Sequence, residues 1–221
     1  MFLLLMSVFW LASCSEDDNT VDEYANWQER NEKAFADTLA FAQQQGEGKG
    51  WYVYRCWSMA DQTPNVDQFG NKVNLTYKDA DHIIVHVLEK GEGSGCPMYT
   101  DSVKVSYCGR MEGTDTYPAG YVFDGNFDGT YDKATAQLTK YAVADMIDGF
   151  TTALMKMHIG DHWMVYIPWQ LAYGSSGKSP IPGYSMLRFE IVLDSYYHVG
   201  EKVPDSRAAQ GEKAKGVWIT Q

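Results

Sequence analysis

The sequence feature that most limits the fold is a short helical pattern with strand-like runs on either side of it. Residues 148–157 (DGFTTALMKM) place apolar side chains at i, i+3, i+4 and i+7, Asp148 can cap the start, and Gly160 can end the helix. A helix this short is not stable by itself in water. We therefore predict that it buries its apolar face against a sheet formed by the neighbouring strands.

Alternating apolar residues predict the strands of that sheet. The alternation is clear in residues 83–87 (IIVHV), 103–107 (VKVSY) and 187–193 (LRFEIVL), and residues 162–167 (HWMVYI) form a further strand. Residues 50–57 (GWYVYRCW) are rich in β-forming side chains and predict one more. We predict an α+β fold in which a curved, twisted antiparallel sheet wraps around the short helix.

A longer helix is predicted before the first strand. Residues 20–23 (TVDE) have the form of a capping box, with Thr20 as N-cap, and an apolar stripe continues at helical spacing to about Gln45, ahead of Gly46. Such a stripe usually packs on its own protein. The alternative is that it pairs two copies of the chain, and the sequence leaves the oligomeric state open.

The first residues predict export. Residues 1–13 (MFLLLMSVFWLAS) are an apolar run too short to cross a bilayer as a helix, and we interpret them as a signal peptide. The run ends in Leu-Ala-Ser before Cys14, which resembles a bacterial lipobox and implies a lipid on Cys14. We expect residues 14–20 to form an acidic tether, and the protein to be extracytoplasmic and anchored to a bacterial membrane, at the outer membrane or cell surface. An ordinary signal peptide or a buried N-terminal segment is the alternative.

Charge and cysteine content exclude several classes of function. The formal net charge is -11, so a basic surface for nucleic acid is not expected. Cys56, Cys96 and Cys108 remain after Cys14 and allow one disulfide at most. No spacing in the sequence indicates a metal site, a nucleotide-binding loop or a hydrolase triad. We therefore predict neither a metal nor a cofactor.

Six short motifs follow one another in the second half of the chain. They are Val103 to Gly109 (VKVSYCG), Gly120 to Asp124 (GYVFD), Met146 to Gly160 (MIDGFTTALMKMHIG), Ile167 to Gly174 (IPWQLAYG), Ile181-Pro182, and Leu187 to Ile191 (LRFEI). Their order and spacing resemble the FKBP-type peptidyl-prolyl cis-trans isomerases, over roughly residues 83–197. The fold of that family, a twisted antiparallel sheet around a short helix, is the one predicted above.

The resemblance implies a proline pocket that needs no nucleophile, metal or cofactor. It assigns catalytic roles to Tyr107, Phe123, Asp124, Ile147, Phe150 and Tyr173, and substrate-binding roles to Met146, Ile181, Phe189 and Tyr141. Phe150 stands where the family has Trp at the pocket floor. Two segments depart from the family pattern at the pocket rim: the one between Tyr173 and Ile181 is a residue shorter, and the one between Gly113 and Gly120 is longer.

The implied function is prolyl isomerisation of exported proteins, with proline-containing polypeptides as substrates. The predicted organisation is a signal peptide (1–13), a lipid-anchored tether (14–20), a helix-and-strand extension (21–80), an isomerase domain (81–199) and a tail (200–221). One alternative function is a chaperone or binding module with the same fold and little turnover, favoured by the altered rim. Another is a surface protein whose aromatic side chains stack on glycans.

Overall fold

The computed structural model describes residues 22–60, 69–71, 75–198 and 219–220. The predicted signal peptide, Cys14, the tether and most of the C-terminal tail therefore lie outside the described residues. Among the helices of the described ranges, none combines the length and the apolar character needed to cross a membrane.

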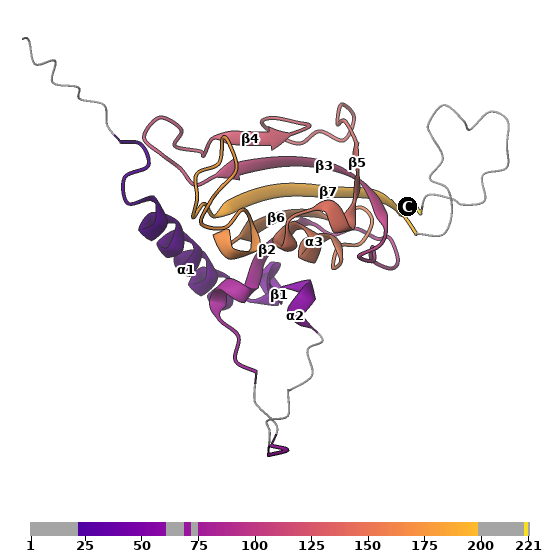
Figure 1. The fold of residues 1–221 in the computed structure, drawn as a ribbon. Coiled ribbons are helices and arrows are strands. Elements are labelled where there is room, and N and C mark those ends of the chain that lie inside the picture. The colour runs from indigo at the N-terminus through magenta and orange to yellow at the C-terminus, as the bar shows by residue number, and fades with distance from the viewer. Residues whose placement is uncertain (1–21, 61–68, 72–74, 199–218, 221) are drawn as a thin grey trace, which may run out of the picture.

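Seven strands form an antiparallel sheet (Figure 1). The strand order is β1-β2-β6-β7-β3-β4, and β5 also pairs with β3. The strands are β1 (Trp51–Arg55), β2 (His82–Glu89), β3 (Ser102–Met111), β4 (Val122–Gly125), β5 (Thr139–Ala142), β6 (His162–Ile167) and β7 (Leu187–Tyr197). The helices are α1 (Trp27–Gln45), α2 (Trp57–Ala60) and α3 (Asp148–Leu154), with 3-10 turns η1 (Glu47–Lys49), η2 (Asp79–Asp81), η3 (Val143–Asp145) and η4 (Trp169–Leu171). The predicted α+β class and the antiparallel sheet are confirmed.

Strand β3 lies at the centre of the region that later forms the site. On one side it pairs with β7 along its whole length, and on the other side it pairs with β4 and then with β5. Asn126 bridges the interval between those two short strands. Its side-chain oxygen accepts the Tyr107 amide at 2.8 Å, and its side-chain nitrogen donates to the Val105 carbonyl at 2.9 Å. One amide side chain thus continues the pairing of β3 where no strand does.

The inner face of the sheet packs on α3. Six of the seven α3 residues are buried, and alternate residues of β3, β6 and β7 meet them in one apolar core. Gly149 permits this close approach, because a Cβ atom there would lie 2.2 Å from Cγ2 of Ile167. The short helix is therefore stabilised by burial rather than by its own hydrogen bonds, as its length requires.

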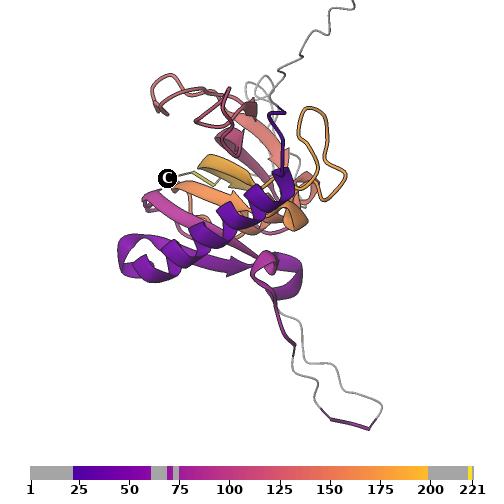
Figure 2. The same cartoon turned by 90° about the vertical axis from the view of Figure 1, so that its left-hand side faces the viewer.

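Helix α1 packs on the outer face at the β1–β2 end of the sheet (Figure 2). Phe35, Leu39 and Ala42 form its buried stripe, which contacts a second apolar cluster around Ile84 and Met186. Strand β1 extends the same sheet, since its five residues pair in register with β2. The prediction that this helix packs on its own protein is confirmed.

Both helices differ from their predicted bounds. Helix α1 begins at Trp27, not after Thr20, which lies outside the described residues. The side chain of Glu23 accepts the Thr114 hydroxyl at 2.6 Å instead of closing a capping box. Helix α3 ends at Leu154, three residues early, because tighter turns replace the α-helical pattern there. Asp148 is its first residue and not its cap, and its carboxylate accepts the Trp57 indole N–H at 3.4 Å.

Two smaller points concern the termini and the cysteines. Ile219 forms an antiparallel bridge with Tyr196 and packs against the core, so the apolar end of the chain docks on β7. Cys56, Cys96 and Cys108 are free thiols in the structure.

Candidate functional site

A pocket of about 260 Å³ opens on the inner face of the sheet, between α3 and the strands β3, β4 and β7. Its walls come from elements far apart in the sequence, which meet because α3 packs across the sheet. Nine of the ten residues that the sequence assigned to a proline pocket line it. The full lining is Tyr107, Phe123, Asp124, Tyr141, Asp145, Met146, Ile147, Phe150, Tyr173, Lys178 and Phe189.

The floor of the pocket consists of aromatic side chains that are almost completely buried. Tyr107, Phe150 and Phe189 are each 5% exposed or less. Their rings meet edge to face: Phe150 lies 5.0 Å from Phe189 and 6.1 Å from Tyr107, centroid to centroid. Phe123 continues the series against Phe189 at 5.5 Å and 88°. Such contacts stabilise the rings in fixed orientations, so the floor is a rigid apolar surface.

Gly109 explains how two of these rings fit over the sheet. A Cβ atom on this residue would lie 2.7 Å from both Phe123 and Phe189. Because real contacts of that length essentially never occur, any larger residue would push the rings into the pocket. The glycine of the Val103–Gly109 motif is thus needed for space.

One polar network stands at the side of this floor. The hydroxyl groups of Tyr107 and Tyr141 are 2.7 Å apart. Burial, followed by hydrogen bonds to Tyr141 and Asp124, raises the pKa of Tyr107 far above its ordinary value. The Tyr107 hydroxyl therefore keeps its proton at physiological pH. The negative charge of nearby Asp124 also opposes loss of the Tyr107 proton.

Two further residues with hydrogen-bond donors, Ile147 and Tyr173, line the pocket. Ile147 precedes α3, and its amide has no hydrogen-bond partner within the described part of the chain. Tyr173 is half-buried on the facing loop. Burial, followed by the charge of Asp124 and the neighbouring Tyr141, raises the pKa of Tyr173, so its hydroxyl also stays protonated. The pocket can therefore bind two carbonyl groups of a peptide.

The rim is charged, unlike the floor. Asp124, Asp145 and Lys178 are exposed. The Lys178 ammonium group lies 5.4 Å from the ring centroid of Tyr173, within cation–π range. On a chain of formal net charge -11, this lysine gives the rim a local positive charge beside two carboxylates.

Ile181 is placed differently from the other nine residues. The sequence assigned it a substrate-binding role, but it is not among the residues that line the pocket, and its side chain lies in the apolar core that also contains the floor rings. Its backbone pairs tightly with Lys178, the amide and carbonyl groups of the two residues exchanging hydrogen bonds of 2.9 and 2.6 Å. This turn holds Ile181 against the core and leaves Lys178 at the rim.

A larger hollow of about 320 Å³ lies elsewhere on the molecule and does not have these features. Its lining combines isolated apolar residues with acidic and basic ones, and the charged residues include Glu89, Lys133 and Asp194. Its histidine, His162, is paired with Glu190 at 2.8 Å. The aromatic pocket is therefore the stronger candidate site.

Three residues at or behind the pocket were not predicted from the sequence. Asn126 orders β3 behind Tyr107, yet it lies in an irregular segment that no periodicity marks. Asp145 and Lys178 stand at the rim and are charged residues in turns, which are common on any surface. Lys178 alone carried a usable signal, since it lies inside the loop between two assigned residues, Tyr173 and Ile181.

Comparisons with known proteins agree with this geometry. Residues 93–194 match the family model of the FKBP-type peptidyl-prolyl cis-trans isomerases. The macrophage infectivity potentiator of Trypanosoma cruzi is 32% identical over 114 residues, which are 51% of this chain and 52% of that protein. The FKBP-type 22 kDa peptidyl-prolyl cis-trans isomerase of Escherichia coli K12 is 36% identical over 109 residues, 48% of this chain and 46% of that protein. The chain thus spans about half the length of these two relatives.

Solved structures include similar chains. A peptidyl-prolyl cis-trans isomerase of Pseudomonas syringae pv. tomato is 30% identical, and the match covers 52% of this chain and 74% of that one, with a TM-score of 0.42. Residues 93–194 of the present chain belong to the FKBP-type peptidyl-prolyl cis-trans isomerase family. This range falls within residues 83–197, over which the motifs predicted the resemblance.

Proposed function

We propose that this protein is a peptidyl-prolyl cis-trans isomerase that acts on X-Pro bonds in the aromatic pocket of its inner face. The observation that carries the proposal is the combination of a buried floor of aromatic rings with polar groups on its walls. Membership of residues 93–194 in an isomerase family supports the same activity.

The pocket suits a reaction that breaks no covalent bond. Rotation about an amide bond has a barrier of about 18–20 kcal/mol, because the planar form has partial double-bond character. The twisted form loses that resonance and is less polar across the C–N bond than the planar form, which water solvates well. An apolar site that excludes water therefore favours the twisted form relative to solution.

Each part of the pocket has a role in this proposal. Phe150, Phe189 and Phe123 hold the pyrrolidine ring, with Met146 and Tyr141 as side walls. The Ile147 amide and the Tyr173 hydroxyl donate to carbonyl groups of the substrate. Asp124 and Tyr107 set the polarity beside the carbonyl that turns, since the Tyr107 hydroxyl keeps its proton and bonds to the Tyr141 hydroxyl.

We further propose that the protein works outside the cytoplasm, anchored by a lipid on Cys14. The support is the lipobox-like sequence Leu11-Ala12-Ser13-Cys14 after an apolar run. Proline-containing segments of exported proteins would then be its substrates. Metabolic labelling with a radioactive fatty acid would show incorporation into the wild-type chain and none into Cys14→Ala; equal labelling of both would exclude this anchor.

A protease-coupled assay on proline tetrapeptides tests the activity. We expect wild-type protein to accelerate isomerisation and Asp124→Ala to lower kcat/KM by about tenfold, equivalent to about 1.4 kcal/mol of transition-state stabilisation. Asp37→Ala is the matched control, because Asp37 is an exposed aspartate whose partner is the surface residue Lys33. A wild-type rate equal to the uncatalysed rate would refute the enzyme and leave a binding module.

A further inference from the structure

Two segments that lead into pocket-lining strands both contact the beginning of α1. The β3–β4 segment (residues 112–121) leads directly into Phe123 and Asp124. The η4–β7 segment (residues 172–186) contains Tyr173 and Lys178 and leads into Phe189. These are the two rim segments that depart in length from the family pattern.

The β3–β4 segment is held at its start by the N-terminal extension. One guanidinium nitrogen of Arg30 donates to the Gly113 carbonyl at 2.8 Å, and the other donates to the Glu23 carbonyl at 3.1 Å. Glu23 in turn accepts the Thr114 hydroxyl at 2.6 Å. Arg30 and Glu23 thereby close a small network around residues 113 and 114.

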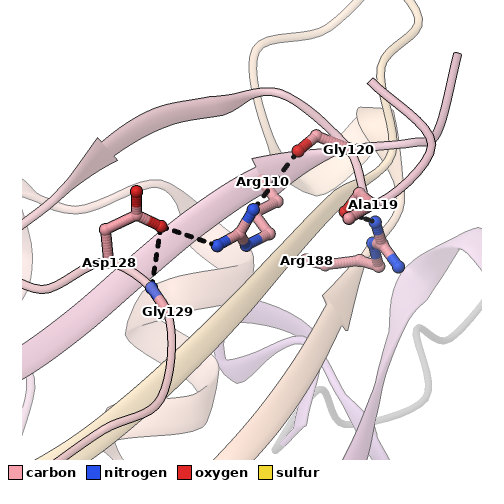
Figure 3. A network of polar contacts seen from close by, with 6 residues as sticks. All are labelled: Arg110, Ala119, Gly120, Asp128, Gly129 and Arg188. Atoms are coloured by element: carbon pink, nitrogen blue, oxygen red, sulfur yellow. Dashed lines mark hydrogen bonds and ion pairs between the residues drawn. The ribbon is translucent and has the colours of Figure 1, made fainter. Parts of the chain in front are cut away.

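The end of the same segment is held by the sheet instead (Figure 3). Arg188 of β7 donates to the Ala119 carbonyl at 2.7 Å. Arg110 of β3 donates to the Gly120 carbonyl at 3.4 Å and pairs with Asp128 at 2.9 Å. The isomerase-family region thus fixes residues 119 and 120. Gly113 and Thr114 bond instead to Arg30 and Glu23 of the N-terminal extension, in addition to the turn in which Thr114 bonds to Tyr117.

The η4–β7 segment is held by the same turn of α1. The indole N–H of Trp27 donates to the Ser185 hydroxyl at 2.8 Å, and the Asn31 side chain accepts the Met186 amide at 2.8 Å. Trp27, Asn31 and Ser185 are each buried. Hydrogen bonds removed from water leave a costly unsatisfied group when one partner is lost, so these contacts fix the segment firmly.

We infer that the first turns of α1 position the substrate pocket, with Arg30 as the positioning residue for the β3–β4 segment and Trp27 for the η4–β7 segment. The inference rests on the proposed function. The apolar stripe of α1 would hold the helix on the sheet without any of these bonds. The polar contacts instead gather at one end of the helix and reach the two segments that lead into the pocket-lining strands β4 and β7.

The mechanism predicts a particular kinetic signature. When a rim segment is loose, only a fraction of molecules have an assembled pocket, and the apparent affinity for substrate falls by that fraction. Once a peptide is bound, the walls are in place and turnover proceeds as before. Loss of positioning should therefore raise KM and leave kcat nearly unchanged, whereas a general loss of stability would reduce the amount of active enzyme and lower kcat.

Steady-state kinetics of the full chain tests this signature. We expect Arg30→Ala to raise KM by about fivefold with kcat within about twofold, the effect of losing a partly exposed charged hydrogen bond. Arg30→Lys should recover part of the affinity, because one ammonium group can reach one of the two carbonyls. Lys33→Ala is the control on the same helix, where only an exposed ion pair is lost. Unchanged KM in Arg30→Ala, or equal effects in Lys33→Ala, would overturn the inference.

Amide hydrogen exchange provides a test that does not depend on catalysis. Without substrate, Arg30→Ala should speed exchange in residues 111–125, and Trp27→Phe, which keeps an aromatic ring but removes the indole donor, should speed it in residues 181–187. The amides that pair the centre of β3 with β7 should be unaffected in both. Unchanged exchange in the rim would refute the positioning role even in an active enzyme. If the wild-type chain lacks isomerase activity, the proposed function fails while the exchange data still decide whether α1 holds the rim.

Discussion

Helices α1 and α3 pack on opposite faces of one sheet, but they contribute to the candidate site in different ways. All of α3 except its first residue is buried, and it supplies the pocket floor through Phe150. Helix α1 is nearly three times as long but buries one stripe, and its contribution near the pocket is a set of hydrogen bonds. The core thus supplies the floor of the site, whereas we infer that α1 positions the segments that lead into its walls.

The largest expected effect comes from removing a leucine from each helix. Leu154 is fully buried in α3 and Leu39 is 5% exposed in α1. We expect Leu154→Ala to lower the free energy of unfolding by about 4 kcal/mol, and Leu39→Ala by about 2 kcal/mol, since α1 borders solvent and can relax into the space. Urea denaturation of the full chain measures both. A larger loss of unfolding free energy in Leu39→Ala than in Leu154→Ala would show that α1 contributes more to stability than α3 does.

Alkaline pH should affect the buried tyrosines on the two faces of the sheet to different extents. Burial and the neighbouring Tyr52 raise the pKa of Tyr54, on the inner side, to about 12. Burial also raises the pKa of Tyr166 on the outer side, while Arg188 opposes that rise. Above about pH 10 the unfolded chain loses tyrosine protons that the folded protein retains, so the free energy of unfolding falls as pH rises toward 12.

Denaturation at a series of pH values tests this assignment. The slope between pH 10 and pH 12 should become shallower in Tyr54→Phe than in Tyr166→Phe, because the inner tyrosine has the larger pKa shift. Below pH 9 tyrosine is protonated in the folded and the unfolded state. Tyrosine ionisation should then contribute no pH dependence to the free energy of unfolding of the wild type or of either variant. Equal slopes in the two variants would show that the faces bury their tyrosines alike.

The smallest effect should arise at the rim, at Lys178. Its ammonium group is exposed and lies over Tyr173, so it can attract a carboxylate next to the proline of a substrate. We expect Lys178→Glu to lower kcat/KM by about threefold for peptides with Glu before proline, the scale of an exposed ion pair, and to leave peptides with Ala unchanged. Loss on both peptides would assign Lys178 to the loop structure instead of to substrate choice.

The sequence predicted the inner face better than the outer face for a physical reason. Strands β6 and β7 show alternating apolar residues, and α3 shows helical spacing, because burial of one face determines which positions are apolar. The nine pocket residues follow from motifs whose side chains must meet over that core. Periodicity carries no information on Asn126, whose side chain replaces a strand, or on the pairing of Arg30 with Gly113, 83 positions away.

The errors also have local causes. Residues 20–23 show a capping pattern, but Glu23 bonds to Thr114 across the fold, and such a tertiary contact cannot be seen in a pattern of four residues. The substrate-binding role of Ile181, assigned from the Ile181-Pro182 motif, stays a prediction. Its backbone forms a tight turn with Lys178, and loop sequences alone do not specify such turns.

Exchange NMR on a proline peptide at equilibrium tests the central claim most directly, because it reports binding and isomerisation in one sample. The pocket account predicts that wild-type protein speeds cis–trans exchange, and that Phe150→Leu loses at least about tenfold of this rate because the floor loses its ring. Phe41→Leu, which alters an exposed ring on α1, should match the wild type. Peptide binding without faster exchange in the wild-type protein, or equal rates in Phe150→Leu and Phe41→Leu, would contradict the claim that this aromatic floor catalyses prolyl isomerisation.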